Sequence, residues 1–210
     1  MTTALVLGNG PSLDHLAVDY DQFEVIVATN RLISSEHIMT RSNAVYVAAD
    51  IRFAPSEEWL KSLSRYQGTS WLGPDLVESL GWVTSERVRI VPDQLTCDLA
   101  QEFARSFPPL TFPLMNVALD FALPVALNYS PTKVILSGVD FDYALEESER
   151  SPRYWKGYTS MSARFDHTKN SAESWSKTSN QRLQTMTTWL SEQQPAVRVR
   201  TLPQRPTHEN

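Results

Sequence analysis

Residues 4–13, Ala-Leu-Val-Leu-Gly-Asn-Gly-Pro-Ser-Leu, contain the stretch that decides the fold. The apolar run Ala4–Leu7 predicts a buried strand, and the glycines after it allow a sharp turn and a close approach of the backbone to a ligand. If a helix begins directly after this turn, its exposed N–H groups can hold a phosphate. We therefore predict a phosphate-binding loop, with an ordinary strand-to-helix turn as the equal alternative. The loop is not the dinucleotide motif G-x-G-x-x-G, because no third glycine follows Gly10 at the required spacing.

Further short apolar runs predict more strands of the same sheet. They are Val25–Ala28, Ala44–Ala48, Arg87–Val91, Lys133–Leu136 and Val197–Leu202, with Trp71 and Leu72 as a seventh candidate. The first runs are almost continuously apolar, which is typical of parallel strands that are covered on both faces.

Segments with a helical spacing of apolar residues lie between these runs. One begins at Pro55 with acidic residues suited to a first helical turn, and others lie around residues 95–103, 119–127 and 183–190. Pro124 is expected to kink or break the third of these helices. The alternation predicts an α/β fold, namely a doubly wound, mostly parallel, Rossmann-like sheet of about six or seven strands with helices on both faces.

Residues 144–179 differ from the rest of the chain. They are rich in Ser, Tyr, Trp, Arg and Glu and have no clear apolar period. A loop of this length within a compact domain is usually a functional lid or an extended excursion. We therefore expect one Rossmann-like domain formed by residues 1–143 and 180–210, and a lid on the acceptor side formed by residues 144–179.

Composition excludes several classes of protein. Hydrophobic residues make up 41% of the 210 residues, and the net charge of −5 predicts no basic face for nucleic acid. The single cysteine, Cys97, can form neither an internal disulfide nor a multi-thiolate metal site, which favours a reducing compartment. The chain begins without the basic segment of a signal peptide and has no apolar run long enough for a membrane span, so we expect a cytoplasmic protein.

Polar residues follow three of the predicted strands. Asn30 and Asp50 come after the second and third strands, and Ser137, Gly138 and Asp140 follow the run at residues 133–136. In open α/β sheets ligands bind beyond the carboxyl ends of the strands, so these residues are candidate ligand contacts. Each also has a plain alternative, because asparagine and aspartate commonly cap helices or form turns.

His167 lies in the polar cluster of residues 165–170. A histidine titrates near neutral pH and can serve as a general base, although a loop histidine is more often simply solvated. The sequence has no paired Cys/His spacing for zinc, no Walker loop and no nucleophile elbow.

Three motifs together resemble the bacterial sialyltransferases of glycosyltransferase family 42. They are Gly8–Leu13, the sequence Leu-Ser-Gly-Val-Asp-Phe at residues 136–141, and His-Thr-Lys-Asn at residues 167–170. The resemblance covers roughly residues 4–190. It implies a metal-independent transferase that uses a CMP-activated sugar, with a Rossmann-like nucleotide-sugar-binding domain and a lid that closes over the donor.

The resemblance also implies roles for individual residues. His167 would deprotonate the acceptor hydroxyl, and two tyrosines would stabilise the leaving phosphate. Tyr143 lies one place beyond the expected position of the first tyrosine, and Tyr154 or Tyr158 is the candidate for the second. The donor nucleotide and its sugar would contact Gly8, Asn9, Gly10, Ser12, Asn30, Asp50, Asn116, Ser137, Gly138 and Asp140.

The sequence departs from the family pattern at three places. Asp50 stands where the family has an asparagine, Asp142 stands at the expected tyrosine position, and no arginine lies near Pro113. A carboxylate at Asp142 would oppose the charge that develops on the phosphate if it pointed inward. The departures are compatible with another CMP-linked acid sugar, such as Kdo.

Two other functions stay open at this point. One is a nucleotide-binding module without transfer activity. The other is a Mg²⁺-dependent enzyme similar to the pterin diphosphokinases, in which Asp50, Asp140 and Asp142 would hold the metal. The transferase hypothesis implies a CMP-sugar donor, a glycan acceptor on lipopolysaccharide or capsule, and no cofactor. A homo-oligomer and a peripheral position on a membrane are compatible with the resemblance.

Overall fold

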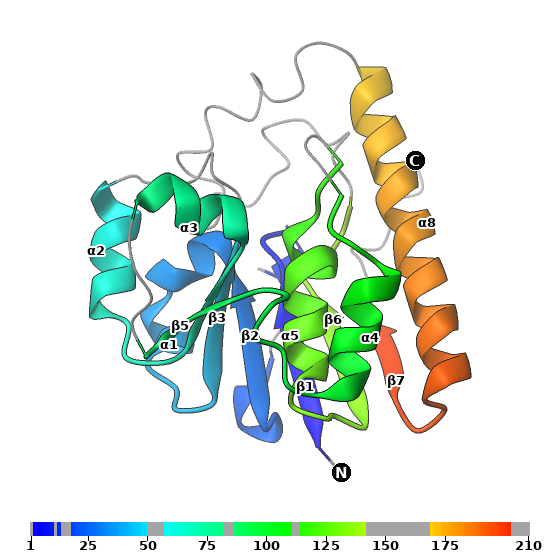
Figure 1. Ribbon diagram of the computed structural model, residues 1–210, viewed down its shortest axis with the longest axis horizontal. Helices are drawn as coiled ribbons and strands as arrows, with labels where there is room; N and C mark the ends of the chain where they lie inside the picture. Colours follow the sequence, from blue (N-terminus) through cyan, green and yellow to red (C-terminus); the bar gives the residue numbers. More distant parts are fainter. Residues whose placement is uncertain are drawn as a thin grey trace.

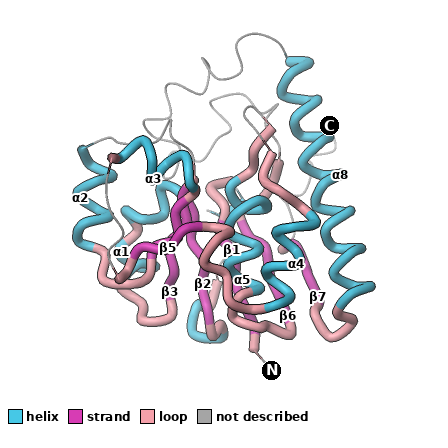
Figure 2. The backbone as a smooth tube through the Cα atoms, viewed as in Figure 1, coloured by secondary structure: helices cyan, strands magenta, loops and turns pink. Residues whose placement is uncertain are grey.

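The fold is described from a computed structural model of the chain (Figure 1). The description covers residues 2–10, 12–13, 18–49, 57–81, 86–110, 114–141 and 169–202, with the side chains of residues 169–173 left aside. Strands and helices alternate along these segments, as Figure 2 shows.

The described residues form one sheet of seven parallel strands. The strands are β1 (Thr3–Leu7), β2 (Val25–Thr29), β3 (Ala44–Ala48), β4 (Ser70–Leu72), β5 (Val88–Ile90), β6 (Lys133–Ser137) and β7 (Arg198–Thr201). Every apolar run identified in the sequence, including Trp71 and Leu72, lies in or overlaps one of them. All residues of β2 and β3 are buried, as expected for strands with both faces covered.

The order of the strands is β5-β4-β3-β2-β1-β6-β7. The chain therefore builds the sheet outward from β1 to β5 and then returns to place β6 on the other side of β1. This reversal of direction makes the gap beyond β1 and β6 the topological switch point, where open α/β sheets bind ligands. Leu7 pairs with Ala28 of β2 and with Ser137 of β6, so the three strands end at nearly the same level.

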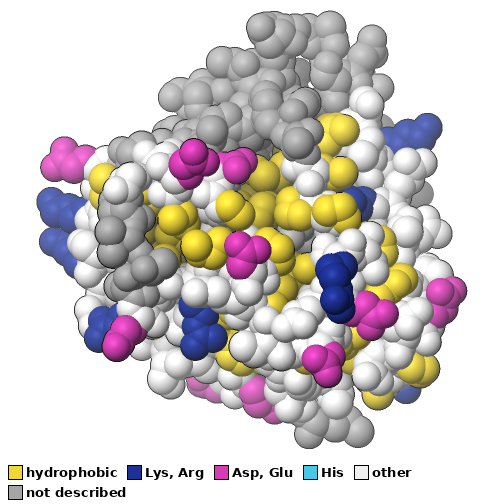
Figure 3. All heavy atoms as spheres, viewed as in Figure 1, with side chains coloured by type: hydrophobic (Ala, Val, Ile, Leu, Met, Phe, Trp, Pro, Cys, Tyr) yellow, Lys and Arg dark blue, Asp and Glu magenta, His cyan; other side chains and the backbone are white. Residues whose placement is uncertain are grey.

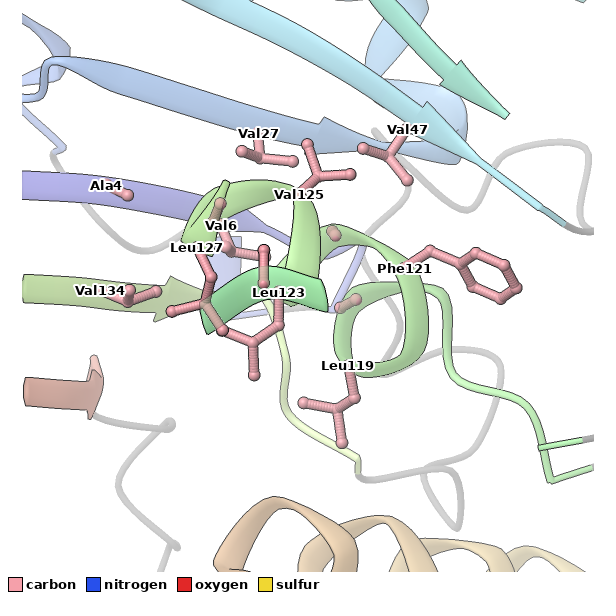
Figure 4. Packing of buried hydrophobic residues seen from close by; sticks show 14 of the residues in the cluster. Ala4, Val6, Val27, Val47, Leu119, Phe121, Leu123, Val125, Leu127 and Val134 are labelled. Carbon is pink, nitrogen blue, oxygen red and sulfur yellow. The ribbon is translucent and has the colours of Figure 1, made fainter. Parts of the chain in front are cut away.

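One face of the sheet is covered by α4 (Asp98–Ser106), α5 (Leu123–Leu127) and α8 (Lys169–Gln193). Alternate strand residues such as Val6, Val27 and Val47 belong to the same buried cluster as Leu123 and Val125 of α5 (Figure 4). Burial of these side chains follows from the two-residue period of a strand, which presents every second side chain to this face.

The opposite face is covered by the 3₁₀ helix η3 (Asn30–Ser34) and by α1 (Glu36–Met39), α2 (Glu57–Arg65) and α3 (Pro74–Leu80). Another short 3₁₀ helix, η2 (Tyr20–Gln22), precedes β2. Leu5 and Ile26 pack with Leu32, and Tyr46 packs with Trp59. Helices thus lie on both faces, which confirms the predicted doubly wound fold.

Of the two outcomes expected at Pro124, a kink or a break of the helix, the break is wrong. A π-helix, η4 (Ala118–Ala122), leads directly into α5, and the N–H of Leu123 donates to the carbonyl of Ala118 across the wider turn. Proline has no N–H to donate, and a π turn is the kind of irregularity that accommodates such a gap in the ladder. The segment therefore stays helical and wholly buried on the sheet.

Helix α8 spans 25 residues and contains Ser179, the expected end of the lid segment. The C-terminal part of that segment is therefore helix and not loop, while its start at residue 144 lies outside the described residues. None of the described helices is both long and apolar enough to cross a membrane.

Candidate functional site

Two loops meet at the switch point beyond β1 and β6. The glycine loop comprises residues 8–13, of which residue 11 lies outside the description, and the β6 loop comprises residues 138–141. The N–H of Gly8 donates to Ser137 O at 2.8 Å, and that of Gly10 donates to Gly138 O at 2.7 Å. The N–H of Ser12 donates to Asp140 Oδ2 at 2.9 Å, across 128 residues of sequence. The fold thus joins two motifs that the sequence identifies separately.

Glycines are needed here because the two loops are in contact. A Cβ on Gly8 would overlap Gly138 O, and a Cβ on Gly10 would overlap the carboxylate of Asp140 and lie 2.7 Å from Gly138 O. Gly138 itself has a φ of +66°, in the left-handed region that glycine adopts readily. The sequence predicts that glycines in the first loop let the backbone approach a ligand, whereas the described atoms show them approaching the other loop.

Most described N–H groups of the glycine loop donate hydrogen bonds within the protein. Those of Gly8, Gly10 and Ser12 bind the β6 loop or the end of β6, and the N–H of Leu13 donates to Gly10 O at 3.1 Å. These four N–H groups are therefore not available for a phosphate, whereas the N–H groups of residues 14–17, where the expected helix would begin, lie outside the described residues. Asp140, in turn, caps the backbone of Ser12, which is the plain alternative that the sequence leaves open for it.

Asn9 braces the glycine loop against the loop after β2. Its side-chain Nδ2 donates to Thr29 O and to Thr29 Oγ1, both at 3.0 Å. Its Oδ1 accepts from the N–H of Arg31 at 3.2 Å, while the hydroxyl of Thr29 donates to Leu7 O at 2.9 Å. The Asn9 side chain thus makes hydrogen bonds to Thr29 and Arg31 within the protein, which gives it a structural role at the site.

Asn30 adopts an unusual backbone conformation beside this brace. Its φ is +50°, a left-handed value that asparagine tolerates better than most residues. Its carbonyl accepts from the hydroxyl of Tyr46 at 2.8 Å, and that hydroxyl accepts from Trp59 Nε1 at 2.7 Å. The sequence gives no direct sign of this arrangement, although a tyrosine within the apolar run of β3 is a polar group that must find a partner.

Two buried polar atoms near the strand ends have no hydrogen-bond partner among the described residues. They are Asn30 Oδ1 and Ser137 Oγ, and Ser137 is only 2% exposed. They lie at the ends of β2 and β6, on either side of β1. A buried polar atom without a partner is costly, and native proteins usually satisfy it with water or a ligand. These two atoms are therefore candidate ligand contacts.

Asn116 occupies a capping position before η4. Its Oδ1 accepts from the N–H of Leu119 at 3.2 Å, and its own N–H donates to Asp120 Oδ2 at 2.9 Å. Asp120 is buried and also accepts from Arg182 Nε of α8 at 2.7 Å. Burial raises the pKa of the Asp120 carboxyl, against the opposing effects of the Asn116 N–H and Arg182. Sequence reasoning missed this pair, and an aspartate in an otherwise apolar helix is the signal that could have found it.

Four of the predicted site residues lie outside the described residues. They are His167, Tyr143, Tyr154 and Asp50, and the same holds for Asp142. The assignment of a general base and of a phosphate-stabilising pair therefore stays a prediction. Among the described residues, no group of three or more His, Cys, Asp or Glu side chains is placed to hold a metal ion.

Three cavities lined by described residues lie away from the two loops. One of them, of about 890 Å³, lies beside α2 and β5 and includes Tyr66 and Arg87 in its lining. Neither it nor the cavities beside it are lined by any of the predicted site residues. On the face seen in Figure 3, Lys and Arg side chains are scattered among Asp and Glu around a hydrophobic area, without a single basic patch.

Comparison of the chain with models of known families, with curated proteins and with solved structures gives no match. The site is therefore interpreted from its own geometry. At the carboxyl end of the parallel sheet, hydrogen bonds hold the loops together. The buried side-chain oxygen Asn30 Oδ1 and the buried hydroxyl of Ser137 lie on either side of β1. Such groups can accept from and donate to the polar edges of a nucleotide.

Proposed function

We propose that the chain is a glycosyltransferase that binds a CMP-activated acid sugar at the carboxyl edge of its sheet. The observation that carries the proposal is the meeting of the glycine loop and the β6 loop at the switch point between β1 and β6, through the 2.9 Å contact of Ser12 N with Asp140 Oδ2. These loops hold two of the three motifs by which the sequence resembles sialyltransferases of glycosyltransferase family 42.

The described residues have two kinds of role in this proposal. The scaffold of the site is formed by Gly8, Asn9, Gly10 and Asp140. Hydrogen bonds of these residues join the loops, and the absence of a Cβ on the two glycines lets the loops lie close together. Asn30 Oδ1 and Ser137 Oγ contact the nucleotide, because they are buried and have no described partner. Binding of the nucleotide would then offset the cost of burying these two atoms.

The chemical step follows from the resemblance. The acceptor oxygen attacks the anomeric carbon and loses its proton to His167, while the bond from that carbon to the phosphate oxygen breaks and CMP leaves. Negative charge grows on the phosphate as this bond breaks, and hydroxyl groups such as those of Tyr143 and Tyr154 would stabilise it. No metal ion takes part.

The first test is nucleotide binding measured by calorimetry with CMP, CDP, UMP and ATP, each with Mg²⁺ and with EDTA. Selective binding of CMP that EDTA does not change is expected, and transfer from CMP-sialic acid or CMP-Kdo is then measured. Preference for ATP with Mg²⁺ would replace the proposal with a diphosphokinase. Binding of none of the four nucleotides would overturn the proposal.

Ser137→Ala tests the role of the buried hydroxyl. The variant is expected to weaken CMP binding by roughly 5- to 10-fold, the effect of one lost hydrogen bond, while the thermal midpoint stays the same or rises because an unpaired buried group is gone. Ser179→Ala is the matched control, since it removes an equally buried hydroxyl without a described partner from α8. Equal CMP affinity in the two variants would contradict the contact at Ser137.

A further inference from the structure

The peptide group between Asn30 and Arg31 is held at both of its polar atoms. The carbonyl of Asn30 accepts from the Tyr46 hydroxyl at 2.8 Å, and the N–H of Arg31 donates to Asn9 Oδ1 at 3.2 Å. Tyr46 comes from β3 and Asn9 from the glycine loop after β1, so the two partners approach this peptide from different strands. We call these two hydrogen bonds the peptide clamp. A peptide plane fixed at both ends cannot rotate without breaking one of them.

The direction of the hydrogen bonds around Tyr46 is fixed by chemistry. An indole nitrogen only donates, so the Tyr46 hydroxyl must accept from Trp59 Nε1 and has its single proton left for Asn30 O. Tyr46 is fully buried, and burial raises the pKa of its hydroxyl, with the bond from Trp59 acting in the opposite sense. The hydroxyl therefore stays protonated at every pH at which the protein is normally handled, and the clamp does not titrate.

The clamp acts on a residue whose conformation needs support. Asn30 has a φ of +50°, which costs free energy for a residue with a Cβ, and such values persist where surrounding contacts enforce them. The same residue carries the buried Oδ1 that has no described partner. The backbone of Asn30 sets where its side chain begins, so contacts to the neighbouring peptide restrict the positions that this oxygen can take.

We propose that Tyr46 is a positioning residue of the nucleotide site, acting with Asn9 through the peptide clamp to hold Asn30 Oδ1 where it accepts a hydrogen bond from the bound nucleotide. The inference rests on the proposed function for the identity of the ligand, although the clamp itself does not. Tyr46 touches no ligand in this scheme and acts only through Asn30. Trp59 supports it by fixing the direction of its hydroxyl.

Tyr46→Phe removes the proton that binds Asn30 O and leaves the ring in place. It is expected to weaken CMP binding by about 5- to 10-fold in calorimetry, because a misplaced acceptor loses one hydrogen bond to the nucleotide. Tyr66→Phe is the matched control. Its hydroxyl is also buried and donates to a backbone carbonyl, Ala44 O at 2.6 Å, but at the opposite end of β3. Both variants are expected to lower the thermal midpoint, whereas only Tyr46→Phe is expected to change CMP affinity.

A second pair of variants separates positioning from a general loss of stability. Asn30→Gly removes the side chain and suits the positive φ, so the fold is expected to tolerate it while CMP binding weakens. Adding Tyr46→Phe to Asn30→Gly is then expected to cause no further loss of CMP affinity, because the group that Tyr46 positions is gone. Additive losses, or equal CMP affinities of Tyr46→Phe and Tyr66→Phe, would overturn the inference.

Hydrogen exchange gives a readout that needs no ligand. Tyr46→Phe is expected to speed exchange of the Arg31 N–H at least several-fold, because loss of one half of the clamp loosens the other. The N–H of Ile26, which donates to Asn43 O, serves as the internal reference for global stability. If the unmodified chain binds no CMP, the proposed function fails, and the exchange of Arg31 alone decides whether the clamp exists. Unchanged Arg31 exchange in Tyr46→Phe would refute the clamp whatever the ligand is.

Discussion

Asn9 and Tyr46 bind the two ends of one peptide group, that between Asn30 and Arg31, although they lie on different strands or loops of the sheet. Asn9 also binds Thr29, and the loop that contains it is bonded to the β6 loop. The ends of β1, β2 and β6 are therefore connected to one another and, through the Tyr46 side chain, to β3. A substitution of Asn9 or Tyr46 is therefore expected to alter both the stability of the loops at the carboxyl ends of the strands and the binding of a ligand there.

Asn9→Ala removes three hydrogen bonds, those of the Asn9 amide with Thr29 O, with Thr29 Oγ1 and with the N–H of Arg31. We expect it to lower the free energy of unfolding by about 2–3 kcal/mol, measured by urea denaturation. Asn43→Ala is the control, since the Asn43 side chain makes one described hydrogen bond, to Phe23 O, and its loss should cost about 1 kcal/mol. Equal losses in the two variants would show that Asn9 does not connect the loops.

Gly10→Ala places a methyl group against the Asp140 carboxylate and Gly138 O. The two loops must separate to admit it, so we expect a loss of about 2–3 kcal/mol in unfolding free energy together with loss of CMP binding. Gly81→Ala is the control, because Gly81 has a φ of +63° and open space where a Cβ would lie. That variant is expected to cost about 1–2 kcal/mol through backbone strain alone and to bind CMP normally. Normal CMP binding by Gly10→Ala would contradict the close contact of the loops.

Arg182→Met removes the partner of the buried Asp120 carboxylate. We expect the free energy of unfolding to fall by about 3–5 kcal/mol near neutral pH, because the buried carboxylate loses its charged partner. The pKa of Asp120 in the folded chain lies above its usual value, so protonation in acid removes this charge, and ionisation lowers stability as pH rises through the folded pKa.

The difference in urea midpoint between Arg182→Met and the unmodified chain is therefore expected to shrink as the pH is lowered into the acid range, because protonation of Asp120 removes the buried charge. Adding Asp120→Asn to Arg182→Met is expected to recover part of the loss. A difference that does not vary with pH would mean that Asp120 stays ionised or that the loss comes from the Arg182 bonds to Phe107 O and Pro108 O.

His167→Ala tests the proposed general base. Binding of CMP is expected to be unchanged, since the base acts on the acceptor, while transfer falls by about 10²-fold or more. His208→Ala is the control for a general effect of losing an imidazole from a polar segment. Unchanged turnover in His167→Ala would show that His167 is not the general base. A loss of CMP binding would instead place His167 in the donor site.

Local patterns were sufficient to predict the sheet. Runs such as Ala44–Ala48 are buried strands because a stretch of continuous apolar residues has no stable exposed form and fits a parallel sheet covered on both faces. The helix at residues 119–127 was also predicted, but its continuity across Pro124 was not. Proline disfavours a regular helix, and only the packing of this wholly buried segment against the sheet retains it as a π turn followed by α5.

The sequence by itself determined the positions of the strands, the residues at their ends and the alternation of strands and helices that is typical of a doubly wound fold, because each depends on neighbours within a few residues. Tertiary structure decided what those residues do. It directed the N–H groups of Gly8, Gly10 and Ser12 to the β6 loop and left Asn30 Oδ1 and Ser137 Oγ without described partners. Hydrogen bonds between loops 128 residues apart depend on how the strands are ordered in the sheet, and no local pattern records that order.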